Sequence, residues 1–313
     1  MPLNLLEPAD SAGLASLKDR SILITGGASG LGESTTRFLA QHGAYVTMVD
    51  VKDGTALASQ LTGQGQHVQF VHCDITDYTS QIAAFEAAKT FSSTGELDDV
   101  LAFAGVDDAG PLVDAIAASP GIPPPPSTTA LDVNIKGTLY TTTLALHYLR
   151  TTTTTTTESP QQEATQLSKS LTLVASMAAY VDDTHNTAYT ASKFALRGLF
   201  RAVRAAAHAQ LHIRVNALAP WAMRTPMTDP ILTHLETLGI KAGEGKGITL
   251  VEHGVLTAAV GRLVTDGRIR GRSVAVVPEE AVDLGDDFAG AYAGQALRAL
   301  MVGAEGRGDF LHS

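Results

Sequence analysis

A tyrosine and a lysine four residues apart, Tyr189 and Lys193, are the pair in this sequence best suited to acid/base chemistry. On a helix this spacing places both side chains on one face, one turn apart. The lysine ammonium favours the phenolate and lowers the tyrosine pKa from its ordinary value of about 10. Such a phenol can donate a proton to a carbonyl or accept one from an alcohol. Most pairs with this spacing lie on solvated helix surfaces, so the rest of the sequence must support the chemistry.

Composition and charge restrict the class of protein. The chain has 313 residues, of which 44% are hydrophobic and 17% charged, as in globular proteins. Its net charge of −10 argues against non-specific binding to nucleic acids or anionic membranes. Cys73 is the single cysteine, and the ten histidines show no metal-ligand spacing, so no metal site is expected. The sequence shows neither a signal-peptide pattern nor an apolar run of about 20 residues, so we expect a cytoplasmic protein.

Short apolar runs alternate with helical patterns along most of the chain. Strands are expected at residues 21–25, 44–50, 67–71, 99–103, 171–175, 213–217 and 273–277. Helices are expected at residues 30–42, 55–61, 81–91, 127–149, 188–208, 249–264 and 289–301. This alternation predicts a single α/β domain over residues 1–313, with a doubly wound, seven-stranded parallel sheet of the Rossmann type and helices on both faces.

Several segments fall outside the alternating pattern. Residues 107–126 contain Pro111 and four consecutive prolines, which are incompatible with a helix or a central strand, so we expect a loop. The remaining segments are interpreted as an N-terminal arm (1–20), a threonine-rich surface insertion (151–168), a substrate lid (221–247) and a C-terminal extension (279–313).

A glycine-rich turn, Thr25-Gly-Gly-Ala-Ser-Gly-Leu-Gly32, follows the first predicted strand and opens the first long helix. Glycines at such a turn let backbone N–H groups approach a phosphate, and the helix N-terminus favours its charge. In this strand–turn–helix context the motif predicts a dinucleotide site. The residues expected to bind the cofactor here are Gly26, Ser29, Gly30, Leu31 and Gly32.

Two aspartates end the next two predicted strands. Asp50 stands where a carboxylate hydrogen-bonds a ribose 2′-hydroxyl and repels a 2′-phosphate, which favours NAD over NADP. Lys52 is the only cation close to it in the sequence. Asp74 stands where it could reach the adenine, although a plain turn residue explains it nearly as well.

These motifs occur in the order found in the short-chain dehydrogenase/reductase family, which the chain resembles over nearly its whole length. The glycine-rich turn matches, and Ser176 precedes Tyr189 by 13 residues. Asn134 lies in Asp132-Val-Asn-Ile-Lys-Gly137, which is similar to the family's asparagine motif. The resemblance implies a catalytic tetrad of Asn134, Ser176, Tyr189 and Lys193.

The resemblance also implies a role for each group. Tyr189 would exchange a proton with the substrate oxygen, Lys193 would lower its pKa and bind the nicotinamide ribose, and Ser176 would polarise the substrate. Asn134 would hold a water that links Lys193 to solvent. Further cofactor contacts are implied for Ala104, Gly105, Pro220 and Thr225, in addition to Tyr189 and Lys193.

The chain departs from the family pattern at two positions. Phe103 replaces the usual asparagine after the fourth strand, so the backbone there must be hydrogen-bonded differently. Trp221 replaces a usual glycine, and we expect it to narrow the site with an aromatic wall. Segments 106–108, 180–185 and 221–227 should surround the nicotinamide. The substrate contacts predicted within or beside them are Met177, His185 and Trp221.

The first hypothesis is an NAD-dependent oxidoreductase that interconverts a secondary alcohol and a ketone. The chain is similar to fungal members that act on polyketide-type metabolites and to the prostaglandin-dehydrogenase-like branch. The alternatives are an NADPH-dependent ketoreductase, a cyclase or dehydratase without net redox change, and a nucleotide-sensing protein. The expected partners are a small-molecule substrate and further copies of the chain, as a homodimer or homotetramer through the helices near 127–150 and 188–208. Nucleic acids and membranes are not expected partners.

Overall fold

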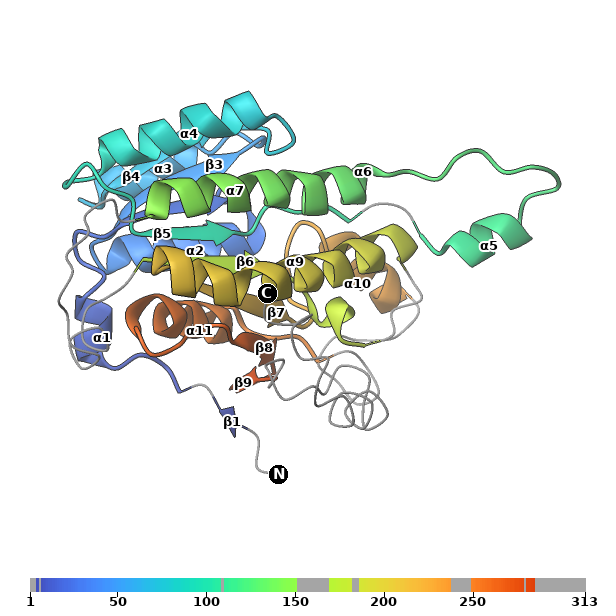
Figure 1. Cartoon of the computed structure of the whole chain (residues 1–313). Coiled ribbons are helices and arrows are strands. Elements are labelled where there is room, and N and C mark those ends of the chain that lie inside the picture. Colours follow the sequence, from blue (N-terminus) through green and yellow to red (C-terminus); the bar gives the residue numbers. More distant parts are fainter. Residues whose placement is uncertain are drawn as a thin grey trace, which may run out of the picture.

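A parallel β-sheet forms the centre of the molecule (Figure 1). The computed structural model describes residues 4–5, 7–107, 110–150, 169–181, 186–237, 249–278 and 280–284. The order of the parallel strands is β4-β3-β2-β5-β6-β7-β8, and it reverses on either side of β2, as in a Rossmann fold. The strands are β2 (Ser21–Thr25), β3 (Tyr45–Asp50), β4 (Val68–His72), β5 (Asp99–Ala102), β6 (Ser170–Val174), β7 (Arg214–Pro220) and β8 (Ser273–Val277). All seven predicted strands and the predicted fold class are confirmed.

Two short strands extend the sheet beyond this prediction. β9 (Glu280–Asp283) pairs antiparallel with β8, and β1 (Asn4–Leu5) pairs antiparallel with β9. The sheet of the described residues therefore has nine strands. These two strands were missed because segments of four and two residues carry no readable period, and β1 meets β9 only across nearly the whole length of the chain.

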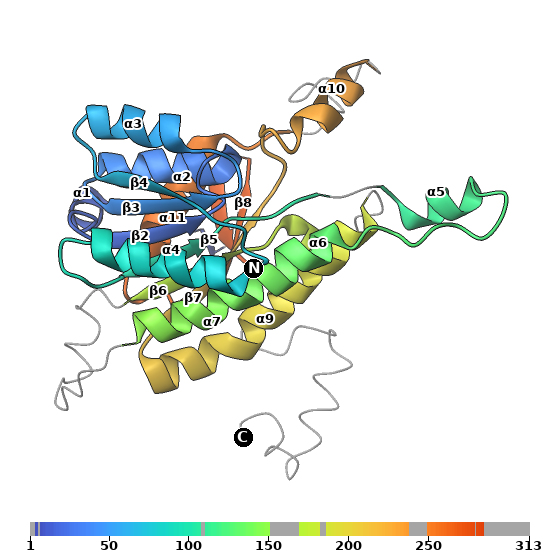
Figure 2. The same cartoon turned by 90° about the horizontal axis from the view of Figure 1, so that it is seen from above.

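Helices cover both faces of the sheet (Figure 2). One face carries α1 (Ser11–Ala15), α2 (Gly30–Gln41), α3 (Thr55–Gly63) and α11 (His253–Thr265). The other carries α4 (Tyr78–Phe91), α7 (Thr138–Leu149) and α9 (Thr187–Leu211). The predicted helices at the positions of α2, α3, α4, α7, α9 and α11 are confirmed, with ends that differ by a few residues. α1 lies in the predicted N-terminal arm, where no helix was expected.

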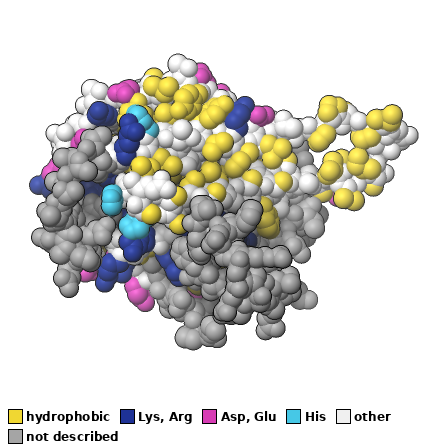
Figure 3. All heavy atoms as spheres, viewed as in Figure 1, with side chains coloured by type: hydrophobic (Ala, Val, Ile, Leu, Met, Phe, Trp, Pro, Cys, Tyr) yellow, Lys and Arg dark blue, Asp and Glu magenta, His cyan; other side chains and the backbone are white. Residues whose placement is uncertain are grey.

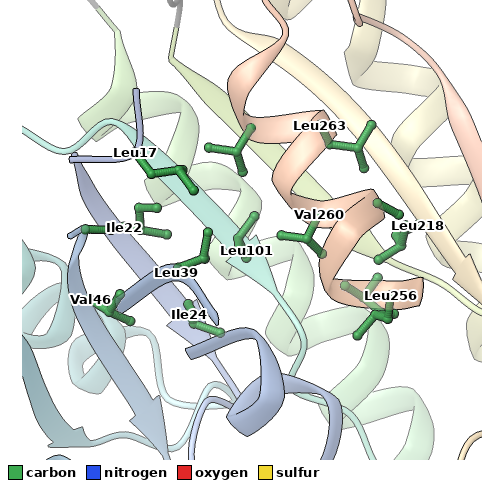
Figure 4. Close-up of a cluster of buried hydrophobic side chains, with 14 of the residues drawn as sticks. Leu17, Ile22, Ile24, Leu39, Val46, Leu101, Leu218, Leu256, Val260 and Leu263 are labelled. Carbon is green, nitrogen blue, oxygen red and sulfur yellow. The ribbon is translucent and has the colours of Figure 1, made fainter. Parts of the chain in front are cut away.

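The sheet separates two hydrophobic cores, and β2 shows how. Ile22 and Ile24 belong to the core beneath α2 and α11, whereas Leu23 between them belongs to the core beneath α4, α7 and α9. All three side chains are fully buried, because successive residues of a strand point to opposite faces and both faces are covered. Figure 4 shows the first core, where Leu39 of α2 and Leu256, Val260 and Leu263 of α11 pack onto the strands.

The prediction that residues 107–126 form a loop is wrong in one part. A short helix, α5 (Leu112–Ala117), lies between the prolines and stands clear of the sheet and its covering helices (Figures 1 and 2). Pro111 is the N-cap residue of α5 and so removes no hydrogen bond from the helix, and the six residues of the helix contain no proline or glycine. Val113 and Ile116 of this helix are largely exposed.

The helix predicted at 127–149 is present but is not uniform. It begins as α6 (Thr129–Leu131), continues as a π-helix, η1 (Asp132–Gly137), and ends as α7. Asn134 lies in the π-helical turn. Such turns occur mostly as local insertions in α-helices at functional positions, and no sequence period identifies them.

The predicted substrate lid contains one helix, α10 (Asp229–Thr237), in its described part. The threonine-rich insertion at 151–168 and the helix predicted at 289–301 lie outside the described residues. Across the part of the chain that the structure describes, no helix combines the length and apolar character needed to span a membrane.

Candidate active site

A cavity of about 610 Å³ opens at the carboxyl ends of the parallel strands, where β2 is flanked by β3 and β5. This is the switch point of the strand order, where ligands of open α/β sheets bind. Every residue predicted to contact the cofactor lines the cavity: Gly26, Ser29, Gly30, Leu31, Gly32, Asp50, Asp74, Ala104, Gly105, Tyr189, Lys193, Pro220 and Thr225. The structure thus brings together residues that span nearly 200 positions of sequence.

The glycine-rich turn is shaped for close backbone approach. Gly26 has a positive φ of 68°, and a Cβ added there would lie 2.7 Å from the backbone nitrogen of Ala104. A Cβ on Gly32 would lie only 2.0 Å from the carbonyl oxygen of Gly26. Ser29 is the N-cap residue of α2, and its side chain makes no capping hydrogen bond with the first N–H groups of this helix. Those N–H groups fit the phosphates of a dinucleotide.

Asp50 supports the glycine-rich turn directly. Its Oδ2 accepts a hydrogen bond from the Ala28 N–H (3.1 Å), and its Oδ1 accepts one from the Lys52 N–H (3.0 Å). A carboxylate has about four acceptor positions, so it retains capacity for a ribose hydroxyl in the cavity. Asp74 also lines the cavity, and its Oδ1 accepts from the Thr76 N–H (2.8 Å). Asp74 is therefore a turn residue, and its contact with adenine remains a prediction.

Tyr189 and Lys193 lie on the cavity side of α9, near its N-terminus. Asn186 caps the helix, because its Oδ1 accepts a hydrogen bond from the Tyr189 N–H (3.3 Å). The Lys193 Nζ lies 5.3 Å from the centroid of the Tyr189 ring and donates to the Val174 carbonyl (3.2 Å). The phenol of Tyr189 and the amine of Lys193 therefore lie at the same cavity, as their spacing on the helix predicts.

Burial lowers the pKa of the Lys193 ammonium. The side chain is almost fully buried, and desolvation lowers its pKa from 10.5 to about 8, with Asp107 opposing the shift. Between these two values the unfolded chain holds a proton that the native chain has lost, so the free energy of unfolding rises with pH there. We expect Lys193→Met to raise the free energy of unfolding of the cofactor-free protein near pH 7. The difference between variant and wild type should shrink by up to about 3 kcal/mol towards pH 10.5, because the wild type gains stability over that range. Denaturant unfolding of both proteins across this range measures it, and a pH-independent difference would contradict the assignment.

Ser176 follows β6 and begins a single 3₁₀ turn, η2 (Met177–Ala179). Its Oγ accepts a hydrogen bond from the Ala178 N–H (3.1 Å), which fixes the side-chain rotamer at the cavity wall. Because η2 packs against α9, the serine reaches the same cavity as Tyr189.

Asn134 is placed differently from the other three tetrad residues. It is fully buried, and it is not among the described residues that line the cavity. Its amide exchanges two hydrogen bonds with the backbone of Val106 (2.7 and 2.9 Å) and donates a third to Ser192 Oγ (2.9 Å). The side chain therefore ties the loop after β5 to α9, and its predicted water contact remains a prediction.

The structure explains how the two departures from the family pattern are accommodated. The side-chain hydroxyl of Thr25 accepts a hydrogen bond from the Ala104 N–H (3.2 Å), and its carbonyl accepts one from the Phe103 N–H (3.1 Å). Phe103 itself packs against the core beneath α2 and α11. Trp221 lines the cavity and is 39% exposed.

The predicted substrate contacts are only partly described. Met177 lies in the cavity wall with Trp221, whereas His185 falls outside the described residues. Sequence reasoning did not single out Val51, Cys73 or Ile75, which also line the cavity. Their only signal is that each is adjacent in sequence to Asp50 or Asp74.

Residues 20–236 match the model of the short chain dehydrogenase family. This match spans more than half of the chain, and the chain belongs to the short-chain dehydrogenase family. It is therefore an oxidoreductase of the alcohol dehydrogenase/reductase type, which uses a nicotinamide cofactor and a small-molecule substrate.

The chain is similar along almost its whole length to two fungal enzymes. It is 37% identical to the 5′-hydroxyaverantin dehydrogenase of Dothistroma septosporum, covering 92% of this chain and 94% of that protein. It is 38% identical to the 5′-hydroxyaverantin dehydrogenase of Emericella nidulans, covering 95% and 97% respectively. A solved short-chain dehydrogenase/reductase from Mycobacterium marinum has the same fold, with a TM-score of 0.67, 20% identity, and coverage of 85% of this chain and 97% of its own.

Proposed function

We propose that this protein oxidises a secondary alcohol of a mid-sized secondary metabolite to a ketone, with NAD as the hydride acceptor. The single observation that carries the proposal is the convergence of Tyr189, Lys193 and Ser176 on the cavity that holds the glycine-rich turn. The similarity to two 5′-hydroxyaverantin dehydrogenases supports an alcohol of that type as the first candidate substrate.

The geometry supports a division of labour among these side chains. Tyr189 accepts the proton of the substrate hydroxyl as the carbon–hydrogen bond breaks, and it returns a proton in the reverse direction. The charge on Lys193 stabilises the phenolate that this transfer needs. Ser176 hydrogen-bonds the substrate oxygen and holds it beside the phenol. A bound nicotinamide supplies the hydride acceptor or donor.

The cavity wall supports a substrate with substantial apolar surface. Its lining away from the glycine-rich turn includes Met177, Val181, Trp221, Met223 and Met227. Methionine side chains adapt to irregular shapes, and the indole offers a flat face to a planar ligand. A fused-ring alcohol would fit such a wall better than a short aliphatic one.

Incubation of the purified protein with NAD and a panel of secondary alcohols, including 5′-hydroxyaverantin, tests the proposal. We expect formation of reduced nicotinamide together with a product lighter by two hydrogens. Turnover without cofactor reduction would instead indicate a cyclase or dehydratase. If no alcohol in a broad panel is oxidised and Tyr189→Phe has no effect in the source organism, the proposal is wrong.

The cofactor preference can be tested at Asp50. We expect the wild type to bind NAD more tightly than NADP, and Asp50→Asn to reduce this preference by about ten-fold, or about 1.4 kcal/mol. The substitution removes the charge that repels a 2′-phosphate but keeps an oxygen that can accept from the Ala28 N–H. The quenching of Trp221, the single tryptophan, by each cofactor provides the titration.

Lys52→Ala is the control for the cation nearest to Asp50 in the sequence, and this substitution should leave the preference for NAD unchanged or stronger. Tighter binding of NADP to the wild type would favour the NADPH-dependent ketoreductase. One similarity supports the NADPH-dependent alternative. The chain is also 30% identical, over 65% of its length, to an NADP-dependent dehydrogenase of Cochliobolus lunatus.

We further propose that the protein is a homodimer or homotetramer. Leu139 of α7 and Phe194 of α9 are 46% and 45% exposed, on the helices through which the family resemblance implies association. Figure 3 shows hydrophobic side chains gathered on this side of the molecule. Contiguous exposed apolar surface of this kind marks interaction sites. Sedimentation analysis would measure the oligomeric state, and a monomer at all concentrations would refute the proposal.

A further inference from the structure

We propose that Arg197 and Tyr180 are positioning residues that hold the serine turn, η2, in register with α9. The inference rests on the proposed function, in which Ser176 contacts the substrate oxygen. In this inference, contacts made by Arg197 and Tyr180 set the distance between Ser176 and Tyr189. Neither Arg197 nor Tyr180 lines the described part of the cavity.

Arg197 is one helical turn beyond Lys193, on the side of α9 that faces η2. Its Nη1 donates a hydrogen bond to the Ala179 carbonyl (3.1 Å), at the end of the 3₁₀ turn. Its guanidinium carbon lies 4.1 Å from the centroid of the Tyr180 ring, within the range of a cation–π contact. The Arg197 side chain of α9 thus contacts two consecutive residues at the end of the serine turn, Ala179 and Tyr180.

Tyr180 is held from the other side as well. Its hydroxyl hydrogen-bonds the hydroxyl of Ser273, a buried residue at the start of β8. Its backbone N–H donates to the Met177 carbonyl (2.8 Å), which closes the turn. The ring of Tyr180 is therefore fixed between the guanidinium on α9 and the sheet.

A single 3₁₀ turn of three residues cannot fix its own position, because short helical pieces carry few hydrogen bonds. The position of Ser176 therefore depends on β6, which it follows, and on contacts that the turn makes with other elements. Arg197 supplies one from the same helix that carries Tyr189 and Lys193, so α9 positions all three groups of the proposed acid/base site. A misplacement of about 1 Å by a substitution remote from the chemistry can lower a rate by about 100-fold.

The first experiment replaces Arg197 with methionine, which keeps an unbranched apolar side chain and removes the guanidinium. With NAD and the panel alcohol that is oxidised fastest, we expect kcat to fall by about 10- to 100-fold. We expect the dissociation constant for NAD to change by less than about two-fold, because the glycine-rich turn is untouched. The matched control is Arg201→Met, the same change one turn further along α9, which should leave kcat unchanged.

The second experiment distinguishes positioning of Ser176 from a general structural role. We expect Ser176→Ala to lower kcat by about 100-fold or more. If Arg197 acts through Ser176, adding Arg197→Met to Ser176→Ala should lower kcat by less than about two-fold further. Losses that multiply in the double variant would overturn the inference.

The outcomes separate this inference from the proposed function. A fall in kcat for Ser176→Ala with full activity in Arg197→Met would refute the positioning role alone. Full activity in Ser176→Ala would remove the role of the serine and this inference with it, whereas the proposed alcohol oxidation would stand. Should Arg197→Met fail to fold, Tyr180→Phe takes its place, because it deletes only the hydroxyl that bonds Ser273. Its smaller loss, about three-fold or more, should likewise vanish in the Ser176→Ala background.

Discussion

Replacing Tyr189 with phenylalanine should lower kcat/KM for alcohol oxidation by about 10²- to 10⁴-fold, which is the range of general acid/base catalysis. The substitution removes the one oxygen that α9 presents to the cavity beside Lys193. It keeps the ring and so leaves the packing near Lys193 intact. Steady-state kinetics with the oxidised panel alcohol would measure the loss. NAD affinity should change little, because most of the predicted cofactor contacts lie elsewhere in the cavity.

A matched control is Tyr140→Phe. This tyrosine of α7 packs edge-on against the ring of Tyr78 of α4, at a centroid distance of 5.1 Å. It should retain wild-type kinetics. If Tyr189→Phe retained activity within a few-fold of the wild type, another group would have to transfer the proton, and the assignment of the acid/base to Tyr189 would be abandoned.

Replacing Gly32 with alanine should disable the glycine-rich turn. The added Cβ would lie 2.0 Å from the Gly26 carbonyl oxygen and 3.1 Å from the Gly27 Cα, so backbone must move. We expect the free energy of unfolding to fall by about 3 kcal/mol, at the upper end for overpacking. We expect NAD affinity to fall by about 100-fold, because the displaced N–H groups no longer converge on the phosphates. Thermal unfolding and fluorescence titration measure the two effects.

Gly254→Ala is the control for this change. Gly254 lies in the first turn of α11, and a Cβ there would meet no atom within 4 Å. Alanine favours helix over glycine by about 1 kcal/mol, so this variant should be as stable as the wild type or slightly more stable. Wild-type NAD affinity in Gly32→Ala would show that the turn does not contact the phosphates.

The seven parallel strands and the glycine-rich turn were predictable because each is a local pattern. An apolar run such as residues 21–25 must be buried on both faces, and the Gly26 and Gly32 positions admit no side chain. The spacing of Tyr189 and Lys193 likewise fixes their common face once a helix forms. For the same reason the sequence determined which side chains face the cavity from α9.

Other features depend on contacts between distant segments. β1 pairs with β9 from the other end of the chain, and the amide of Asn134 finds its partners on Val106 and Ser192. No sequence spacing predicts either contact, because the segments meet only in the assembled sheet. α5 was missed for a different reason. The prolines on both sides of it favoured a loop in the prediction, although the six residues of the helix are compatible with helical structure.

By itself the sequence determined the identity and local geometry of the reactive groups: a phenol and an amine on one helix face, a glycine turn before another helix, and a serine after a strand. Only the tertiary structure decided how these segments meet. It set the depth at which Lys193 is buried, which lowers its pKa to about 8, and the contact of Arg197 with the serine turn. Burial and long-range contact are properties of the assembled sheet and its covering helices, and no short stretch of sequence contains them.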